Sequence, residues 1–448
     1  MSAVIQQELE ASGVAPVIVV LKQPPATAAA ASTARDISRH FVSSELSQES
    51  AIVSAARAEA ATAAASARRP ASTKARRDAE TAVRAASRLR ARPAVLETAI
   101  PEVEPPPLVR YYPNLGVALG TVTREGLAAL RQDEQVEAVL AAPRIGLIRP
   151  TKRAPAALRP GVTWGIRRLG IPDLWRRGLR GKGVLVGHLD TGVDGRHPAL
   201  KQAIGLFAEF DFFGRQVLPE PAPHDTEEHG THTAGTIAGR TVGRRHFGVA
   251  PGANLASALV IEGGQVVARV LGGMDWAVGQ GVRVLSMSLG LRGFLNDFLP
   301  LTQILRSRGI LPVFAVGNEG PGTSRSPGNY AEALSVGAMG RANHIAAFSS
   351  SQRFVRPVDP VVPDLVGPGV AVISARPGGG FQAMDGTSMA TPHIAGLGAL
   401  LLEAKPSATV DELERAILDS CKLRSGWTPD RAGRGLPNAR LALELLTR

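Results

Sequence analysis

The second half of the chain consists of short apolar runs that alternate with stretches of helical composition. The apolar runs lie at Val184–Leu189, Leu255–Val260, Val282–Ser288, Ile310–Val316, Ala333–Ala338 and Val370–Ser374. Helical patterns occur between them, at Thr231–Gly239, Val266–Gly279 and Leu299–Arg308. Strands without polar alternation are buried on both faces, and strands that alternate with helices form parallel sheets. From residue 164 onward the sequence therefore predicts an α/β fold in three layers, a parallel sheet covered by helices on both faces.

The first part of the chain predicts a separate small α+β unit. Strand patterns occur at Val17–Leu21, Leu108–Tyr112, Leu115–Leu119 and Val136–Leu140. Thr123 can cap a helix that runs through Leu130. Residues 28–92 are rich in Ala, Ser, Arg and Glu, a composition typical of exposed helices or of partial disorder. A basic, Pro- and Ala-rich linker at 151–163 separates the predicted domains, 1–150 and 164–448.

Composition argues against several classes of function. The net charge is +12, but the arginines cluster in the Ala-rich stretch without interleaved aromatic residues, so we expect no nucleic-acid partner. Cys421 is the only cysteine, which rules out an intramolecular disulfide. No apolar run reaches the roughly 20 residues that span a bilayer, so we expect no membrane partner. The N-terminus has no recognisable secretory signal, which favours a cytoplasmic location over export by a non-standard route.

Three polar residues stand where a parallel sheet forms its sites. Asp190 follows the first strand, His229 lies two residues before the helical stretch at Thr231–Gly239, and Ser388 belongs to the first turn of a helix that runs to about Leu402. Alone, Asp190 has an ordinary interpretation as a turn aspartate, and Ser388 has one as an N-cap serine. Together they supply a nucleophile, a base and a group that orients the base. His229 and His232 lack the His-Glu-x-x-His spacing of a metalloprotease, so we expect no catalytic metal.

The motifs around these residues carry a family resemblance. Asp190-Thr191-Gly192, His229–Gly235 and Gly386–His393 occur in the order found in subtilisin-like serine peptidases, and the resemblance covers roughly residues 164–448. It implies that Asp190, His229 and Ser388 form a catalytic triad and that Asn318 donates to the oxyanion. It also implies that a polypeptide substrate pairs as an added strand, with these substrate-binding residues: Ser288, Leu289, Gly290, Ala315 and Gly317.

The N-terminal unit resembles the small ferredoxin-like propeptide of this family. The resemblance implies that residues 1–150 inhibit the catalytic domain as an intramolecular partner until the chain is cut between residues 141 and 161. Ala199 stands where many family members carry a calcium-binding aspartate, and the following loop at 240–247 contains three arginines. We therefore expect no cofactor and no tight calcium site. A weaker calcium site elsewhere stays open.

The expected function is that of a serine endopeptidase synthesised as a self-inhibited zymogen. A dedicated processing peptidase for one intracellular substrate and a non-catalytic binding protein with the same fold are the alternatives. His188 stands where an apolar residue is expected, and we interpret it as a packed core histidine rather than a catalytic group. Glu319, beside the expected substrate pocket, is a candidate for recognising a basic side chain.

Overall fold

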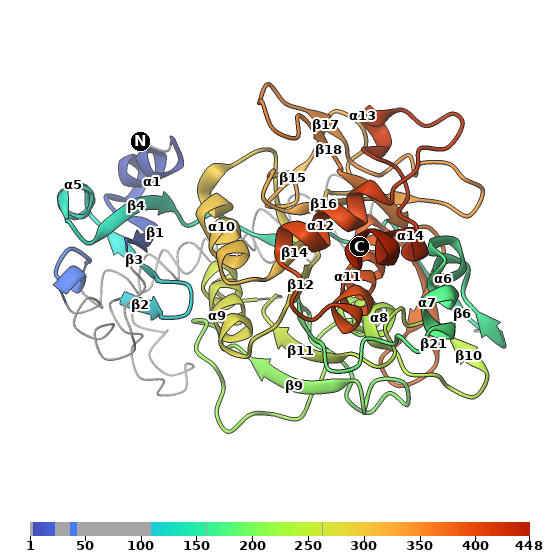
Figure 1. Cartoon of the computed structure of the whole chain (residues 1–448). Helices are drawn as coiled ribbons and strands as arrows, with labels where there is room; N and C mark the ends of the chain where they lie inside the picture. Colours follow the sequence, from blue (N-terminus) through green and yellow to red (C-terminus); the bar gives the residue numbers. More distant parts are fainter. Residues whose placement is uncertain (1–2, 23–35, 43–108, 158, 262) are drawn as a thin grey trace, which may run out of the picture. The chain divides into compact units, whose positions relative to one another are not determined.

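The computed structural model divides the chain into two compact units, Met1–Ala142 and Pro143–Arg448 (Figure 1). It describes residues 3–22, 36–42, 109–157, 159–261 and 263–448. Of the Ala- and Arg-rich insertion predicted at 28–92, all but 36–42 lies outside the described residues. The division between the units falls earlier than the predicted linker at 151–163, so that linker belongs to the second unit.

The first unit is a four-stranded antiparallel sheet with helices packed on it. The strand order is β2-β3-β1-β4, with bounds Val109–Tyr112, Val117–Val122, Ala15–Leu21 and Val136–Ala141. These strands confirm the four strand patterns. The predicted helix is α5 (Arg124–Gln132), where the Thr123 side chain accepts a hydrogen bond from the Gly126 N–H. A second helix, α1 (Ala3–Ser12), was not expected from the sequence.

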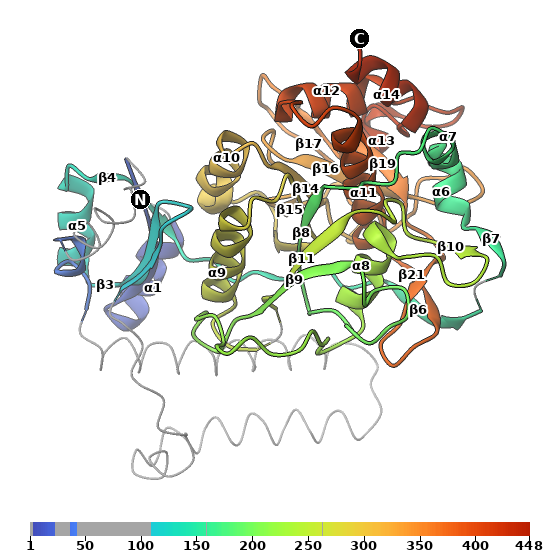
Figure 2. The ribbon, with the colours of Figure 1, turned by 60° about the horizontal axis from the view of Figure 1, so that its bottom comes forward.

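The second unit is organised around a seven-stranded sheet in which every described pair is parallel. In spatial order its strands are β19 (Leu365–Pro368), β16 (Leu334–Met339), β14 (Leu311–Ala315), β12 (Val284–Met287), β8 (Leu185–Asp190), β11 (Asn254–Leu259) and β9 (Ile204–Glu209). Figure 2 shows helices on both faces of this sheet. On one face lie α9 (Val266–Gly279) and α10 (Leu299–Ser307), and on the other α8 (His229–Ala238) and α11 (Thr387–Ala404). The predicted three-layer α/β fold is confirmed for this unit.

The run at Val370–Ser374 was wrongly assigned to the parallel sheet. It forms β20 (Val372–Ala375), which pairs antiparallel with β21 (Phe381–Asp385) in a small separate sheet. A short apolar run does not reveal its partner, and this one is followed by a second strand close enough in sequence to form a hairpin. The sheet takes β9 and β19 instead, which the apolar pattern did not single out.

The first residues of the second unit form two short strands that pair with strands later in the chain. β5 (Gly146–Leu147) pairs antiparallel with β13 (Leu289–Arg292), and β6 (Lys152–Ala156) pairs antiparallel with β21. The remaining elements of this unit lie outside the seven-stranded sheet: β7 (Gly161–Val162), α6 (Trp164–Leu169), α7 (Ile171–Arg176), β10 (Arg245–His246), η2 (Asn296–Phe298), β15 (Arg325–Ser326), β17 (Gln352–Arg353), β18 (Val361–Val362), α12 (Val410–Asp419), α13 (Pro429–Ala432) and α14 (Ala439–Leu446).

Helix α11 forms the centre of the second unit. It is buried on every side from Thr387 to Leu402, as expected for a helix that is apolar all round. Its first turn holds Ser388, and Pro392 is accommodated inside it. Among the described residues, no helix is both long and apolar enough to cross a bilayer.

Candidate active site

The three candidate catalytic side chains come from the ends of three elements. Asp190 is the last residue of β8, His229 the first of α8, and Ser388 the second of α11. All three are buried. The sheet brings them together because β8 is a central strand and both helices pack on the same face, with their N-terminal ends at its carboxyl edge.

Asp190 and His229 are joined by a short hydrogen bond. His229 Nδ1 lies 2.7 Å from Asp190 Oδ1, and the Thr191 N–H donates to the same oxygen at 2.8 Å. Burial disfavours ionisation of Asp190, but the charge and hydrogen bond of His229 outweigh it, so the pKa of Asp190 lies below its ordinary value. An ionised Asp190 can only accept, so Nδ1 carries the proton and Nε2 is left as the basic nitrogen.

A close backbone contact sets the separation of this pair. Gly230, the residue after His229, packs against Gly192 of the loop that follows Asp190. A Cβ on Gly230 would lie 2.0 Å from the Gly192 carbonyl oxygen. Gly192 itself has φ +108°, and a Cβ there would lie 2.2 Å from the His224 carbonyl oxygen. Both motif glycines are therefore required by packing.

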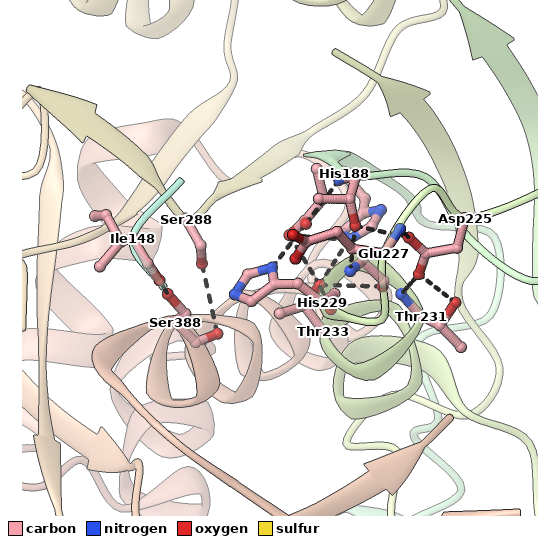
Figure 3. A network of polar contacts seen from close by, with 12 residues as sticks. Ile148, His188, Asp225, Glu227, His229, Thr231, Thr233, Ser288 and Ser388 are labelled. Atoms are coloured by element: carbon pink, nitrogen blue, oxygen red, sulfur yellow. Dashed lines mark hydrogen bonds and ion pairs between the residues drawn. The ribbon is translucent and has the colours of Figure 1, made fainter. Parts of the chain in front are cut away.

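The Asp225 carboxylate joins the loop that follows Asp190 to the first turn of α8. Its Oδ1 accepts from the Thr191 hydroxyl at 2.7 Å and from the Glu227 N–H at 3.0 Å. Its Oδ2 accepts from both the N–H and the hydroxyl of Thr231, at 2.7 and 2.5 Å. Figure 3 shows this carboxylate between the helix and the loop. The sequence interpretation gave Asp225 no role, although it lies four residues before His229.

His188 continues the line of hydrogen bonds behind Asp190. Its Nε2 lies 2.9 Å from Thr233 Oγ1, and Thr233 Oγ1 donates to Asp190 Oδ2 at 3.0 Å. On its other side, Nδ1 lies 2.9 Å from Ser257 Oγ. Burial lowers the pKa of His188, against the opposing charges of Asp190 and Asp225, so the ring is neutral.

The negative charge of Asp190 determines the direction of the hydrogen bonds between Asp190, Thr233, His188 and Ser257. The Thr233 hydroxyl has only acceptors on that side, Asp190 Oδ2 at 3.0 Å and the His229 and Gly230 carbonyls at 3.1 Å, so its proton lies there. Thr233 then accepts from His188, whose Nε2 carries the proton. Nδ1 then accepts from Ser257. His188 is a buried histidine, as expected, but it lies against the hydrogen-bond shell of Asp190, which the sequence did not reveal.

His229 Nε2 has no hydrogen-bond partner among the described residues. In Figure 3 this nitrogen faces the side on which Ser288 and Ser388 lie. The Ser388 hydroxyl instead donates to the carbonyl oxygen of Ile148 at 2.6 Å. The chain's own residue 148 thus lies at the candidate nucleophile.

The segment around Ile148 pairs with a strand of the second unit as a substrate would. Leu147 and Gly146 lie opposite Leu289 and Gly290 in antiparallel register. The Ile148 N–H then donates to the Ser288 carbonyl at 2.9 Å. Main-chain pairing of this kind holds an extended peptide irrespective of most side chains. Three of the predicted substrate-binding residues, Ser288, Leu289 and Gly290, therefore contact the segment.

Asn318 lies beside Ser388 but donates to the next peptide group. Its Oδ1 accepts from the N–H and the hydroxyl of Thr387, at 2.8 and 2.9 Å, which turns the amide nitrogen outward. Nδ2 donates to the Arg149 carbonyl at 2.9 Å. Gly317 accepts from the Thr387 hydroxyl at 3.2 Å, whereas Ala315 is buried at the end of β14.

Comparison with known proteins agrees with this geometry. The model of the subtilase family, Peptidase_S8, matches residues 181–438. The chain belongs to the subtilase family. Over 283 residues it is 37% identical to subtilisin Savinase of Lederbergia lenta, and the aligned region covers 63% of this chain and 98% of that protein. Over 311 residues it is 35% identical to an alkaline protease of Alkalihalobacillus alcalophilus, and the aligned region covers 69% of this chain and 77% of that protein. As a subtilase, the chain is a serine endopeptidase, and its substrates are polypeptides.

Ala199 and Arg240 belong to the segments on which the expectation of no tight calcium site rests. Ala199 offers no side-chain oxygen, and Arg240 fills the neighbourhood with a fixed positive charge. Its Nη1 donates to the carbonyls of Pro251 and Ala253 at 2.5 and 2.7 Å, and its Nη2 to the Gln202 carbonyl and Asn254 Oδ1 at 2.9 and 3.1 Å. Within the described ranges, no group of three or more His, Cys, Asp or Glu side chains is placed to hold a metal ion.

Two acidic residues near the subtilase site differ in what they bind. Glu319 forms an ion pair with Arg325 within the catalytic unit, so its carboxylate is already engaged. Glu227, which the sequence interpretation passed over, pairs with two arginines of the segment that crosses the site, Arg149 and Arg153. The sequence places Glu227 two residues before His229, but only the fold brings those arginines to it.

Proposed function

We propose that this subtilase is a zymogen that cuts itself between Ile148 and Arg149 before it acts on other polypeptides. The observation that carries the proposal is the contact of the Ser388 hydroxyl with the Ile148 carbonyl, in a segment paired to Ser288 in substrate register. Asp190, His229 and Ser388 act as the triad. The cut lies within the range of residues 141–161 expected from the sequence.

In the first step, Ser388 Oγ bonds to the carbonyl carbon of Ile148 while His229 Nε2 takes the hydroxyl proton. The C–N bond to Arg149 then breaks, and His229 returns the proton to the departing Arg149 amine. Water hydrolyses the resulting ester by the same exchange, leaving a carboxylate on Ile148. Asp190 keeps the His229 ring oriented and stabilises its positive charge throughout.

Negative charge that develops on the Ile148 oxygen is stabilised from two directions. The Ser388 N–H lies in the first turn of α11, where backbone N–H groups have no intrahelical acceptor. Asn318 Nδ2, held outward by Thr387, supplies the second donor. It contacts the neighbouring Arg149 carbonyl in the uncut chain, so it must shift by one peptide group as the intermediate forms.

Before the cut, the linker restrains the site. The Ser388 hydroxyl donates to Ile148 and not to His229, so the base has not yet engaged its nucleophile. The first unit, whose strand order and helix α5 between β3 and β4 resemble the ferredoxin-like propeptides of this family, acts as the intramolecular inhibitor. Its residues Met1–Ala142 directly precede the linker, as an inhibitor released by that cut requires.

The test compares the purified full-length chain with its Ser388→Ala variant. The unaltered chain should yield a catalytic fragment whose N-terminus, measured by mass spectrometry, is Arg149. The variant should stay uncut and hydrolyse no peptide. A fragment that begins at Pro150 would move the cut to the next bond, and processing of the purified variant would refute self-cleavage altogether.

We further propose that neither folding nor catalysis depends on a tightly bound calcium ion or another cofactor. The proposal is supported by Ala199 and by the hydrogen bonds of Arg240, which provide a built-in cation at that place. A chelator should change neither the hydrolysis rate nor the unfolding temperature. A fall in either on chelation would refute the proposal.

A further inference from the structure

The segment that crosses the candidate active site carries two arginines that share one carboxylate. Arg149 Nη1 lies 2.7 Å from Glu227 Oε1, and Arg153 Nη2 lies 3.3 Å from Glu227 Oε2. Each arginine takes a different oxygen of Glu227. A weaker contact of 4.0 Å joins Arg153 to Glu228. The two arginines lie at the first and fifth positions after the proposed cut.

Glu227 is positioned by the carboxylate that joins the residues next to Asp190 and His229. Its backbone N–H donates to Asp225 Oδ1, and Asp225 in turn binds Thr191 and Thr231. Although partial burial opposes ionisation, the hydrogen bonds and charges of Arg149 and Arg153 lower the pKa of Glu227. The carboxylate is thus charged and fixed at a short sequence distance from His229.

Surface ion pairs usually contribute little to stability, because solvent screens them and both side chains lose entropy. The ion pairs of Glu227 differ from such surface pairs in where their arginines lie. Both belong to the segment that must leave the active site before a second polypeptide can bind beyond the cut. Glu319, in contrast, keeps its partner Arg325 in the body of the unit. Departure of the segment exposes the Glu227 carboxylate to whatever enters next.

We propose that Glu227 forms an acidic subsite that selects polypeptides with an arginine or lysine directly after the cut bond. The same subsite holds the uncut linker in register through Arg149. This inference rests on the proposed function, since the side of the cut on which Glu227 acts follows from cleavage between Ile148 and Arg149.

The first test measures peptide selection by the processed enzyme. Internally quenched peptides copy residues 145–153, with Arg149 kept or replaced by Gln or Glu. At low salt the enzyme should cut the Arg peptide about five- to tenfold more efficiently, by kcat/KM, than the Glu peptide. In Glu227→Gln that ratio should fall below about twofold, while Glu220→Gln, an exposed charge loss elsewhere on the unit, should keep it.

The second test exchanges the charges within the full-length chain. Arg149→Glu should slow self-cleavage about fivefold or more, and adding Glu227→Arg should restore most of the rate. High salt should reduce both effects, because it screens the pair. Circular dichroism of each variant in the Ser388→Ala background verifies that the fold persists.

The outcomes separate this inference from the proposed function. If no peptide is cut, the proposed function fails. If all three peptides are cut equally well, the enzyme stands and the acidic subsite is refuted. Cleavage after the arginine instead of before it, seen by mass spectrometry of the products, would also refute the subsite as stated. Failure of the charge exchange to restore processing would refute the role of Arg149 in the linker.

Discussion

At the scale of single residues, the site depends on hydrogen bonds whose direction is determined by one charge. Asp190 accepts from His229 and Thr191 through one oxygen and from Thr233 through the other. The neutral ring of His188 then donates to Thr233 through Nε2 and accepts from Ser257 through Nδ1. A buried polar line in which every member has a partner restricts each side chain to one orientation.

Replacing His188 by Val should lower kcat without a comparable change in KM. The loss removes the donor that holds the Thr233 hydroxyl toward Asp190, and one neutral hydrogen bond corresponds to about 1 kcal/mol, or roughly fivefold in rate. Steady-state kinetics on a peptide substrate measures the effect. His188→Gln, which can still donate to Thr233, should recover part of it. An unchanged kcat in His188→Val would show that Asp190 needs no such support.

At the scale of secondary-structure elements, the site is a meeting of one strand end with two helix starts. The first turns of α8 and α11 reach the edge of β8 only because small residues allow close approach. Gly230 contacts the Gly192 backbone directly, with no space for a methyl group. Helix glycines are usually destabilising relative to alanine, so packing must justify them here.

Gly230→Ala should therefore lower activity sharply. The added methyl group would have to displace the Gly192 carbonyl, and a shift of about 1 Å between catalytic groups can cost on the order of a hundredfold in rate. Activity and thermal unfolding would be measured together. Gly398→Ala is the matched control, because its Cβ would meet only side-chain atoms, Val284 Cγ2 at 3.3 Å and Leu311 Cδ2 at 3.8 Å, and no backbone. Equal tolerance of both substitutions would contradict this explanation.

The loop after α8 offers a second prediction at this scale. Arg240→Met should reduce the free energy of unfolding by about 2 kcal/mol, because four oxygen acceptors lose a charged donor. Urea unfolding in the Ser388→Ala background would measure it. Arg244→Met, a change of an exposed arginine in the same loop, should have little effect. If both variants were equally stable, Arg240 would not be the cross-link of this loop.

At the scale of the whole molecule, the catalytic unit buries histidines that cannot easily become charged. Burial lowers the pKa of His232 to about 3 and that of His393 to about 4, although each ring donates to a backbone carbonyl, His232 to that of Val372 and His393 to that of Met389. In the unfolded chain both return to an ordinary value near 6.5. The unfolded state therefore binds more protons than the folded state between these values.

The stability of the catalytic unit should accordingly fall as the pH is lowered below about 6.5. The contribution is fully present above pH 6.5, and each histidine adds a slope of up to about 1.4 kcal/mol per pH unit down to its folded pKa. Denaturant unfolding at pH 8 to 4, in the Ser388→Ala background, measures the slope. His393→Gln should reduce it, and an unchanged slope in that variant would mean that His393 is already charged when folded.

Much of this architecture could be predicted from local pattern. The strands Val184–Leu189 and Leu255–Val260 and the helix Val266–Gly279 were placed within one or two residues, because continuous apolar runs and helical periodicity are local properties. Val370–Ser374 was misassigned for the same reason, since pairing depends on partners distant in sequence.

The sequence by itself determined which residues could form the site, because Asp190, His229 and Ser388 lie in motifs whose glycines and small residues can be recognised along the chain. Only the tertiary structure decided what surrounds them. The link from His188 through Thr233 to Asp190, the contact of Ile148 with Ser388, and the pairing of Glu227 with Arg149 each join residues far apart in sequence. Such contacts follow from the order of strands in the sheet and the path of the linker, and neither leaves a periodic signal in the chain.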